Sequence, residues 1–265
     1  MSGTVLLRNV RPLGGAATDI LIRDGRIAAS GAGADVAAID GGGALALPGL
    51  IEGHAHIDKT VWGGPWYRNA VGPTRWDRIV NERAWRAGGG HDATARGLAI
   101  ARQYLANGTT RMRTHADIDH EIGLAHVQAT LAVRDALAGQ MEMQVVAFPQ
   151  SGILRAPGVA EMMDRALAAG ADVVGGIDPC QIDRDPVRHL DVIFDLAVKH
   201  RCPIDIHLHE PGEMGAFSLD LILERTEAHG LRDLVTISHG FCLGMIAASE
   251  RDGLLDRMAR WGVRI

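Results

Sequence analysis

Residues 49–59 read GLIEGHAHIDK, and this stretch carries more information about the fold than any other. Its apolar start is typical of a short buried strand, and two histidines, His54 and His56, stand where that strand would end. Residues i and i+2 of a strand point to the same face of a sheet. Both imidazoles can therefore reach one ion. The stretch predicts either a pair of metal ligands or a strand end whose histidines have no ligand role.

After residue 49 the chain alternates short apolar runs with helical stretches. Strands are expected at residues 49–56, 109–115, 141–148, 172–177, 203–208 and 234–238, with residues 262–265 as the beginning of a seventh. Helices are expected at residues 92–106, 122–138, 159–169, 191–200, 217–229 and 250–261. Because most of these strands are apolar throughout rather than alternating, the pattern predicts a parallel sheet covered by helices.

Polar side chains stand at the ends of successive strands. They are His54 and His56, His115 and Asp117, Gln150, Asp178, His207 and Glu210, and His239. A site built from the C-terminal ends of many parallel strands is typical of a TIM-type (β/α)8 barrel. The alternative, a doubly wound sheet, gathers its functional residues at one switch point. The sequence has no G-x-G-x-x-G motif between a strand and a helix, so we predict the barrel.

The predicted barrel occupies residues 49–265 and contains strands one to about seven. A complete barrel of this kind takes roughly 250 residues, so we expect one that is incomplete at its C-terminal end. Residues 1–48 read as several short strands, and Asp24-Gly25 between two of them is typical of a tight hairpin turn. These residues are expected to form the N-terminal part of a small β-sandwich-like domain.

The composition limits the class of protein. Of the 265 residues, 47% are hydrophobic and 22% charged, as in globular proteins. The net charge of −5 provides no basic surface for nucleic acid or for an anionic membrane. No run of about 18 apolar residues could span a bilayer, and no apolar signal segment follows Met1. With only three cysteines, the sequence predicts a soluble cytoplasmic protein.

Six motifs at compatible spacing resemble the cytosine deaminase branch of the amidohydrolase superfamily. They are residues 49–59 (GLIEGHAHIDK), 113–117 (RTHAD), 146–153 (VAFPQSGI), 171–176 (ADVVGG), 205–210 (DIHLHE) and 238–239 (SH). The resemblance covers nearly the whole chain. It implies an α/β fold with the (β/α)8 barrel of the metal-dependent hydrolases.

The resemblance implies that His54, His56 and His207 hold one divalent metal ion, Fe2+ or Zn2+, and imidazole suits both. His115 and Asp117 are expected either to support this site or to belong to strand-end structure. In the family the last ligand is an aspartate at the end of strand eight, and no position of this sequence matches it. Binuclear relatives use a carboxylated lysine, commonly from strand four, but the expected fourth strand contains no lysine. A single ion is therefore expected.

By the same resemblance, Glu210 would take a proton from the attacking water and pass it to a ring nitrogen. His239 would hold and polarise that water, and Gln150 would recognise the amide edge of a pyrimidine-like ring. Strand alternation instead places His209 on the same face as His207. Glu210 reaches the site only if the chain leaves regular β geometry after the strand, and His209 is the alternative.

Residues 60–90 contain four of the five tryptophans of the chain. This segment follows the first histidine motif directly. It could stack on a planar ring as a lid, or pack as a loop on the barrel or on a neighbouring subunit. It does not match the cytosine deaminase pattern, so the substrate stays open.

The predicted function is hydrolysis of a C–N bond in a cyclic amidine or amide. The leading case is deamination of cytosine or a related amino-heterocycle with release of ammonia. One alternative is an aminohydrolase that removes an alkylamine from a triazine-like ring, and another is a catalytically inactive truncated chain without the strand-eight aspartate. We also expect the protein to form a homo-oligomer and to take a small-molecule heterocyclic substrate. It is expected to bind neither nucleic acid nor membrane.

Overall fold

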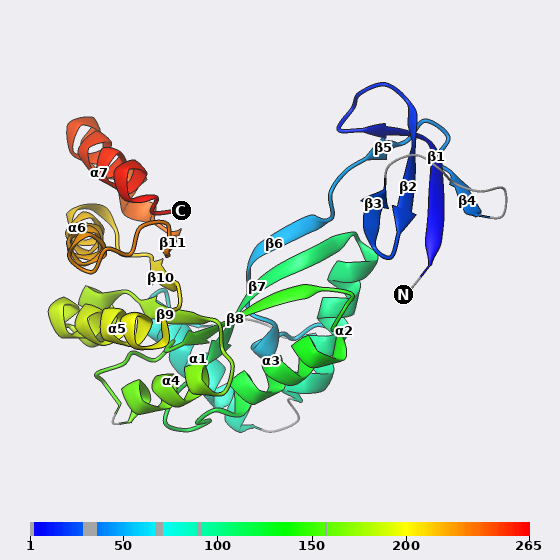
Figure 1. The fold of residues 1–265 in the computed structure, drawn as a ribbon. Helices are drawn as coiled ribbons and strands as arrows, with labels where there is room; N and C mark the ends of the chain where they lie inside the picture. The colour runs from blue at the N-terminus through cyan, green and yellow to red at the C-terminus, as the bar shows by residue number, and fades with distance from the viewer. Residues whose placement is uncertain (1–2, 29–35, 67–70, 89–91, 157) are drawn as a thin grey trace. The chain divides into compact units, whose positions relative to one another are not determined.

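The computed structural model describes residues 3–28, 36–66, 71–88, 92–156 and 158–265 (Figure 1). The chain divides into two compact units, Met1–Gly49 and Leu50–Ile265, one residue from the division expected from the sequence. Within the described ranges, no helix is both long and apolar enough to cross a bilayer. The two units are described separately.

The first unit is a five-stranded sheet. Its strands are β1 (Thr4–Pro12), β2 (Thr18–Arg23), β3 (Arg26–Ala28), β4 (Ala37–Asp40) and β5 (Leu45–Ala46). β1 pairs antiparallel with β2, as β2 does with β3, whereas β4 and β5 pair with β1 in parallel. The turn between β2 and β3 contains Asp24 and Gly25, whose φ angles of 49° and 75° are those that a two-residue hairpin turn requires. The sequence analysis does not predict β4.

Six parallel strands form the sheet of the second unit. They are β6 (Leu50–Ala55), β7 (Thr109–Asp117), β8 (Glu142–Phe148), β9 (Val173–Ile177), β10 (Ile204–Leu208) and β11 (Val235–His239). Their order is β11-β10-β9-β8-β7-β6, so each strand pairs with its neighbours in sequence. A doubly wound sheet reverses its order at a switch point, whereas this order is that of a (β/α) barrel. The prediction of an incomplete barrel is therefore confirmed.

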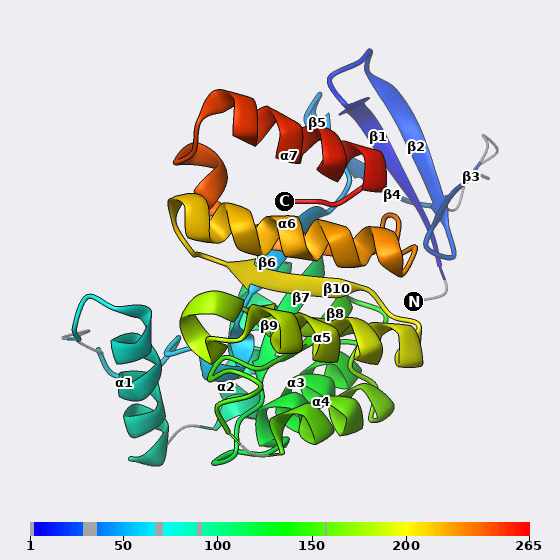
Figure 2. The same cartoon turned by 90° about the vertical axis from the view of Figure 1, so that its left-hand side faces the viewer.

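Helices cover one face of this curled sheet (Figure 2). They are α2 (Ala93–Ala106), α3 (Ala125–Ala136), α4 (Val159–Ala168), α5 (Pro186–His200), α6 (Gly212–Ala228) and α7 (Ala248–Trp261). α3 packs on β7 and β8, α4 on β8 and β9, α5 on β9 and β10, and α6 on β10. The core between the two layers consists of fully buried aliphatic side chains such as Ile193 of α5, Ile206 of β10 and Leu219 of α6. Each of these helices lies where the sequence predicts one.

The chain returns to the sheet after α7. The amide of Ile237 donates to the carbonyl of Arg264 (2.8 Å), and the amide of Arg264 donates to the carbonyl of Val235 (3.0 Å). Arg264 thereby forms a single parallel bridge with Thr236 of β11. This bridge lies within residues 262–265, where the sequence predicts the beginning of a seventh strand.

The tryptophan-rich segment contains a helix that the sequence analysis does not predict. α1 spans Arg75–Ala87 and begins after Thr74, whose hydroxyl accepts from the amide of Asp77 while the Asp77 carboxylate accepts from the amide of Thr74 (3.0 Å). Trp76 of this helix lies against Arg155, with 3.8 Å between the guanidinium carbon and the ring centroid. The segment is therefore partly a capped helix rather than a loop.

We expect Gly175→Ala in β9 to destabilise the fold by about 1–3 kcal/mol, as overpacking of a dense core does. A Cβ atom at this position would lie 2.5 Å from the carbonyl oxygen of Ala147 and 2.9 Å from the Cα of Phe148. The midpoint of urea unfolding measures the change. Gly253→Ala in α7, where a Cβ meets nothing within 4 Å, is the control and should be neutral or stabilising. Equal destabilisation by both substitutions would contradict this account of β9.

Candidate metal centre

A cavity of about 610 Å³ opens at the C-terminal ends of the sheet strands. Its lining combines side chains from the strand ends with side chains of α1, and includes His54, His56, His207, His209, His239, Gln150, Arg75, Arg78, Ile79 and Glu82. Strand-end residues gather here because the carboxyl ends of parallel strands meet at the same edge of a sheet. Of the residues expected at the site, His54, His56, His207, His239 and Gln150 are thus brought together.

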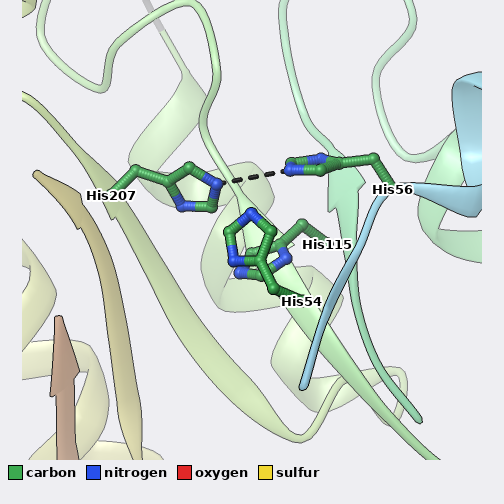
Figure 3. Close-up of side chains that lie close together, drawn as sticks. All are labelled: His54, His56, His115 and His207. Atoms are coloured by element: carbon green, nitrogen blue, oxygen red, sulfur yellow. Dashed lines mark hydrogen bonds between the residues drawn. The ribbon is translucent and has the colours of Figure 1, made fainter. Parts of the chain in front are cut away.

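Four imidazoles lie closest together in this region (Figure 3). They belong to His54 and His56 at the end of β6, His115 in β7 and His207 in β10, and one nitrogen of each lies within 4.8 Å of the others. The ring centroids of His115 and His207 are 4.5 Å apart. His239 adjoins the group, with its ring centroid 4.9 Å from that of His54. His115 is not among the ligands expected from the sequence, although on β7 it lies at the level of His56, which follows the neighbouring strand β6.

Asp205 fixes the protonation of His54 through a serine. The hydroxyl of Ser238 donates to Asp205 Oδ1 (2.7 Å), so it can only accept from His54 Nδ1, which lies 3.1 Å away. His54 therefore carries its proton on Nδ1 and keeps a lone pair on Nε2. Burial alone would raise the pKa of Asp205, but the nearby ring of His115, the hydrogen bond from Ser238 and the charge of Arg113 lower it to about 2. Asp205, the last acceptor in this series of hydrogen bonds, is therefore an anion at neutral pH.

His56 and His207 are neutral at pH 7, so each ring keeps one lone pair. Burial lowers the pKa of each well below 6.5, and the electrostatic effects of Lys59 on His56 and of His115 on His207 lower it further. Their Nε2 atoms face each other at 3.3 Å and can share at most one proton. Their Nδ1 atoms are buried without a hydrogen-bond partner in the described structure. A cation among the four rings would satisfy these lone pairs, so the residues fit a divalent ion that prefers nitrogen ligands.

A second group of possible ligands, His56, Asp58 and Asp117, lies beside the first. The ammonium of Lys59, however, lies 2.9 Å from Asp117 Oδ1. Asp58 Oδ2 accepts from the amide of Asp117 (2.9 Å) and from His126 Nδ1 (2.8 Å). Cationic and N–H groups of the chain thus already face these carboxylates. The four imidazoles are therefore the better ligand set.

The model of the amidohydrolase family matches residues 37–265, which is most of the chain. The chain belongs to the amidohydrolase family. The resemblance of the six motifs to the amidohydrolase superfamily is therefore confirmed. Because this family is metal-dependent, the four imidazoles of this amidohydrolase form a cluster that could bind its metal.

Over 99% of its length, this amidohydrolase is similar to the solved structure of N-isopropylammelide isopropylaminohydrolase from Burkholderia multivorans, with 55% identity and a TM-score of 0.95, and it covers 67% of that chain. It is 30% identical to 5-methylcytosine deaminase from Klebsiella pneumoniae over 98% of its length (TM-score 0.81, 64% of that chain). N-isopropylammelide isopropyl amidohydrolase from Pseudomonas sp. (strain ADP) is 30% identical over 215 residues, which are 77% of this chain and 52% of that protein. The chain spans about half the length of the curated relatives it matches.

Glu210 of this amidohydrolase does not line the cavity in the described structure. β10 ends at Leu208 and the chain then leaves β geometry, yet the Glu210 carboxyl is fully buried. It accepts from the amide of Gln181 (2.7 Å) and from the hydroxyl of Ser218. Burial raises the pKa of Glu210, although these hydrogen bonds act in the opposite direction. His209, the alternative from strand alternation, does line the cavity.

Asp178 at the end of β9 holds the segment that carries His209 and Glu210. Its carboxylate accepts from the amides of His209 (2.6 Å) and Glu210 (3.2 Å), from His209 Nδ1 (2.9 Å) and from the guanidinium of Arg75. Asp178 is fully buried and has a positive φ of 33°. The ring of His209 stacks on that of His239 with 4.1 Å between centroids. Asp178 thus fixes one wall of the cavity, a role that its position at a strand end only hints at.

Ser238→Ala is expected to lower the affinity for Zn2+ about 10- to 100-fold, as the loss of a hydrogen bond behind a metal ligand does. His54 would lose the acceptor that keeps its Nε2 unprotonated. Competition with a chelating zinc dye measures the affinity. Thr226→Ala removes a different buried hydroxyl, which donates to the carbonyl of Ile222 (2.8 Å), and should leave the affinity unchanged. Equal losses in both variants would count against the role of Ser238.

The metal-free protein is expected to lose stability as the pH falls from 7 towards 5. The pKa of His56 and of His207 in the folded state lies below 6.5, so the unfolded chain binds more protons in this range and stability falls with pH. The unfolding temperature measured against pH tests this. His207→Gln should give a shallower slope between pH 7 and 5, and an unchanged slope would refute the assignment. Asp205 acts separately, because its lowered pKa costs stability only as the pH falls below 3.8 towards 2.

Proposed function

We propose that this amidohydrolase uses one divalent ion, zinc or ferrous iron, to hydrolyse the bond between a six-membered nitrogen heterocycle and an exocyclic amine. The observation that carries this is the gathering of several imidazoles and the Gln150 amide around one cavity, with His115 buried beside them. A cavity of about 610 Å³ is large enough for a single substituted ring. The site residues are His54, His56 and His207 as ligands, with His115 beside them.

The favoured substrate is a triazine-like ring that carries an alkylamine. The 55% identity to N-isopropylammelide isopropylaminohydrolase over 99% of this chain supports it. Deamination of a cytosine-like base is the second candidate, because 5-methylcytosine deaminase is 30% identical over nearly the same span. Both reactions share the same chemistry, since water replaces an amine on a ring carbon. The likeness thus favours the triazine-like ring, which is the alternative in the sequence-based prediction, over the cytosine-like base, which is its leading case.

In this reaction a water oxygen forms a bond to the ring carbon, the C–N bond breaks, and the amine leaves with a proton from the water. A bound divalent ion would supply Lewis-acid activation of that water. Burial and its neighbours His209 and His54 lower the pKa of His239 to about 4, so its ring is neutral at pH 7 and can accept a hydrogen bond that orients this water. Gln150 would hold the amide edge of the ring.

Delivery of the proton to the ring nitrogen has two candidates. Glu210, which the resemblance assigns, would have to turn from Ser218 towards the cavity. His209 already lines the cavity, with Nδ1 bonded to Asp178. Glu210→Gln and His209→Asn separate the two, since only the residue that delivers the proton should lower kcat strongly.

The charge of the protein bears on the partners that it can bind. A net charge of −5 suits a protein that takes a small heterocycle and binds neither nucleic acid nor anionic membranes. We propose a cytoplasmic homo-oligomer, which size-exclusion chromatography with light scattering would test.

We expect the zinc- or iron-loaded protein to release isopropylamine from N-isopropylammelide faster than ammonia from cytosine. His239→Asn should retain the metal and lose about 10²-fold in kcat, because it removes the ring that orients the water. His207→Ala should lose the metal itself. Amine release and metal content per chain are measured on the same samples. A fully metal-loaded wild-type protein that hydrolyses neither ring would overturn the proposal.

A further inference from the structure

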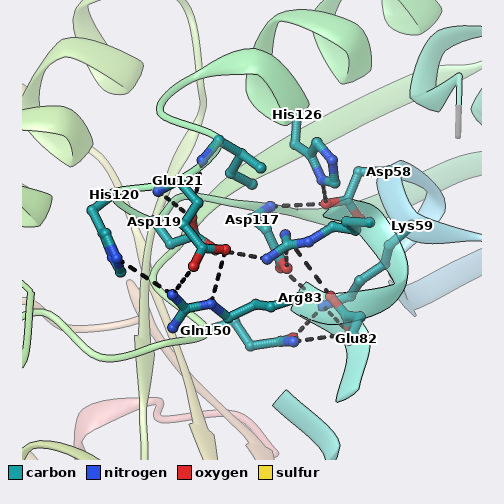
Figure 4. A network of polar contacts seen from close by, with 12 residues as sticks. Asp58, Lys59, Glu82, Arg83, Asp117, Asp119, His120, Glu121, His126 and Gln150 are labelled. Carbon is teal, nitrogen blue, oxygen red and sulfur yellow. Dashed lines mark hydrogen bonds and ion pairs between the residues drawn. The ribbon is translucent and has the colours of Figure 1, made fainter. Parts of the chain in front are cut away.

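The side-chain amide of Gln150 lies between two opposite charges at the wall of the cavity (Figure 4). Its Oε1 accepts from the ammonium of Lys59, and its Nε2 donates to Glu82 Oε2 at 2.9 Å. Lys59 and Glu82 are themselves close, with 3.5 Å between Nζ and Oε2. All three side chains also line the cavity.

These contacts permit one orientation of the amide. An ammonium group only donates and a carboxylate only accepts hydrogen bonds. If the amide turned over, its NH2 group would face the ammonium and its oxygen would face the carboxylate, so both hydrogen bonds would become repulsions. One lone pair on Oε1 and one N–H on Nε2 are left over, and they are offered in a fixed order.

Both charges are held in place by their surroundings. Asp117 Oδ1 lies 2.9 Å from Lys59 Nζ. Burial opposes the charge of Lys59, but Asp117, Glu82 and Asp58 outweigh it and raise the pKa of Lys59 above 10.5. The ammonium therefore persists at any ordinary pH.

Glu82 is brought to Gln150 by α1. On the next turn of that helix, Arg86 pairs with Asp117 Oδ2 (3.2 Å) and with Asp119 Oδ2 (2.7 Å). Arg83 pairs with Glu121, with 3.1 Å between Nε and Oε2. The helix is thus tied to residues at and after the end of β7 independently of Glu82.

We propose that Glu82 is a positioning residue that locks the amide of Gln150 in one orientation and thereby makes the site select a lactam edge. Such an edge presents a carbonyl oxygen to the N–H of Gln150 and a ring N–H to its oxygen. A ring edge with an amino group beside a ring nitrogen offers its donor and acceptor in the reverse order, so it would match both only if the ring turned over. This inference rests on the proposed function and names the ring edge that the site reads.

The test compares Glu82→Gln, Gln150→Ala and the double variant in the metal-loaded protein, with N-isopropylammelide as the probe. Glu82→Gln keeps the shape but frees the amide to turn, so KM should rise about 10- to 100-fold, as expected for a lost charged hydrogen bond. We expect kcat to change less than about 3-fold and metal content to stay the same. In the Gln150→Ala background, Glu82→Gln should have no further effect. Additive effects would overturn the proposal, because Glu82 would then act on the ring directly.

Glu121→Gln is the matched control. It removes the carboxylate that pairs with Arg83 of the same helix and does not touch the cavity. If it raised KM as much as Glu82→Gln does, docking of α1 rather than orientation of Gln150 would be responsible, and the proposal would fail. Should Glu82→Gln not fold, Glu82→Asp withdraws the carboxylate by one methylene and should give a smaller change of the same kind.

A second readout does not depend on turnover. The side-chain amide of Gln150 gives a ¹⁵N–¹H signal that is identified by its absence in Gln150→Ala. We expect slow proton exchange in the wild type and faster exchange in Glu82→Gln, and equal exchange rates would overturn the lock. A wild type that hydrolyses no probe but shows this difference would refute the proposed function and leave the lock intact.

Discussion

The arrangement of the metal centre depends on one buried carboxylate, that of Asp205 in β10. A buried anion is tolerated only where it is paired and hydrogen-bonded. Arg113 pairs with it at 2.9 Å, Ser238 donates to it, and His115 Nε2 lies 3.5 Å away. Arg113 and His115 belong to β7, which does not pair with β10 in the sheet. The carboxylate therefore connects two strands across the concave side of the sheet and at the same time sets the tautomer of His54.

α1 completes the cavity through ion pairs as well as through apolar packing, in which Ile79 joins a buried cluster with Phe148 and Ile177. Arg75 pairs with Asp178, Glu82 with Lys59, and Arg86 with Asp117, so that each contact joins the helix to a residue at or just beyond the end of a strand. Two of these contacts reach residues that orient cavity groups, since Asp178 holds His209 and Lys59 holds Gln150. The scaffold of the barrel supplies the imidazoles, and the helix supplies the polar groups that face them.

Much of the barrel and about half of the site can be predicted from the sequence. Short apolar runs that alternate with helical stretches can be recognised in the sequence without tertiary information. Two histidines at i and i+2, such as His54 and His56, share a face of a strand by its geometry alone. α1 is not among the predicted helices although Trp76, Ile79 and Val80 lie at helical spacing, and its position depends on ion pairs with residues that are distant in the sequence. The same holds for Glu82, whose partner Gln150 lies 68 residues away in the sequence. The direction in which the Glu210 side chain points also depends on a tertiary contact, the hydrogen bond from the hydroxyl of Ser218.

The strand order has a consequence for how the chain reaches its folded state. Each strand pairs only with its sequence neighbours. Apart from the β6–β7 connection, which contains α1 and α2, each pairing closes a loop with one α-helix, and this keeps the entropy cost of each step small. The imidazoles depart from this locality, because His56 and His207 are 151 residues apart. An ion held by both would therefore close a loop of 151 residues across the sheet. It would bind tightly only after every strand between β6 and β10 has docked, and it would then oppose the separation of any of them.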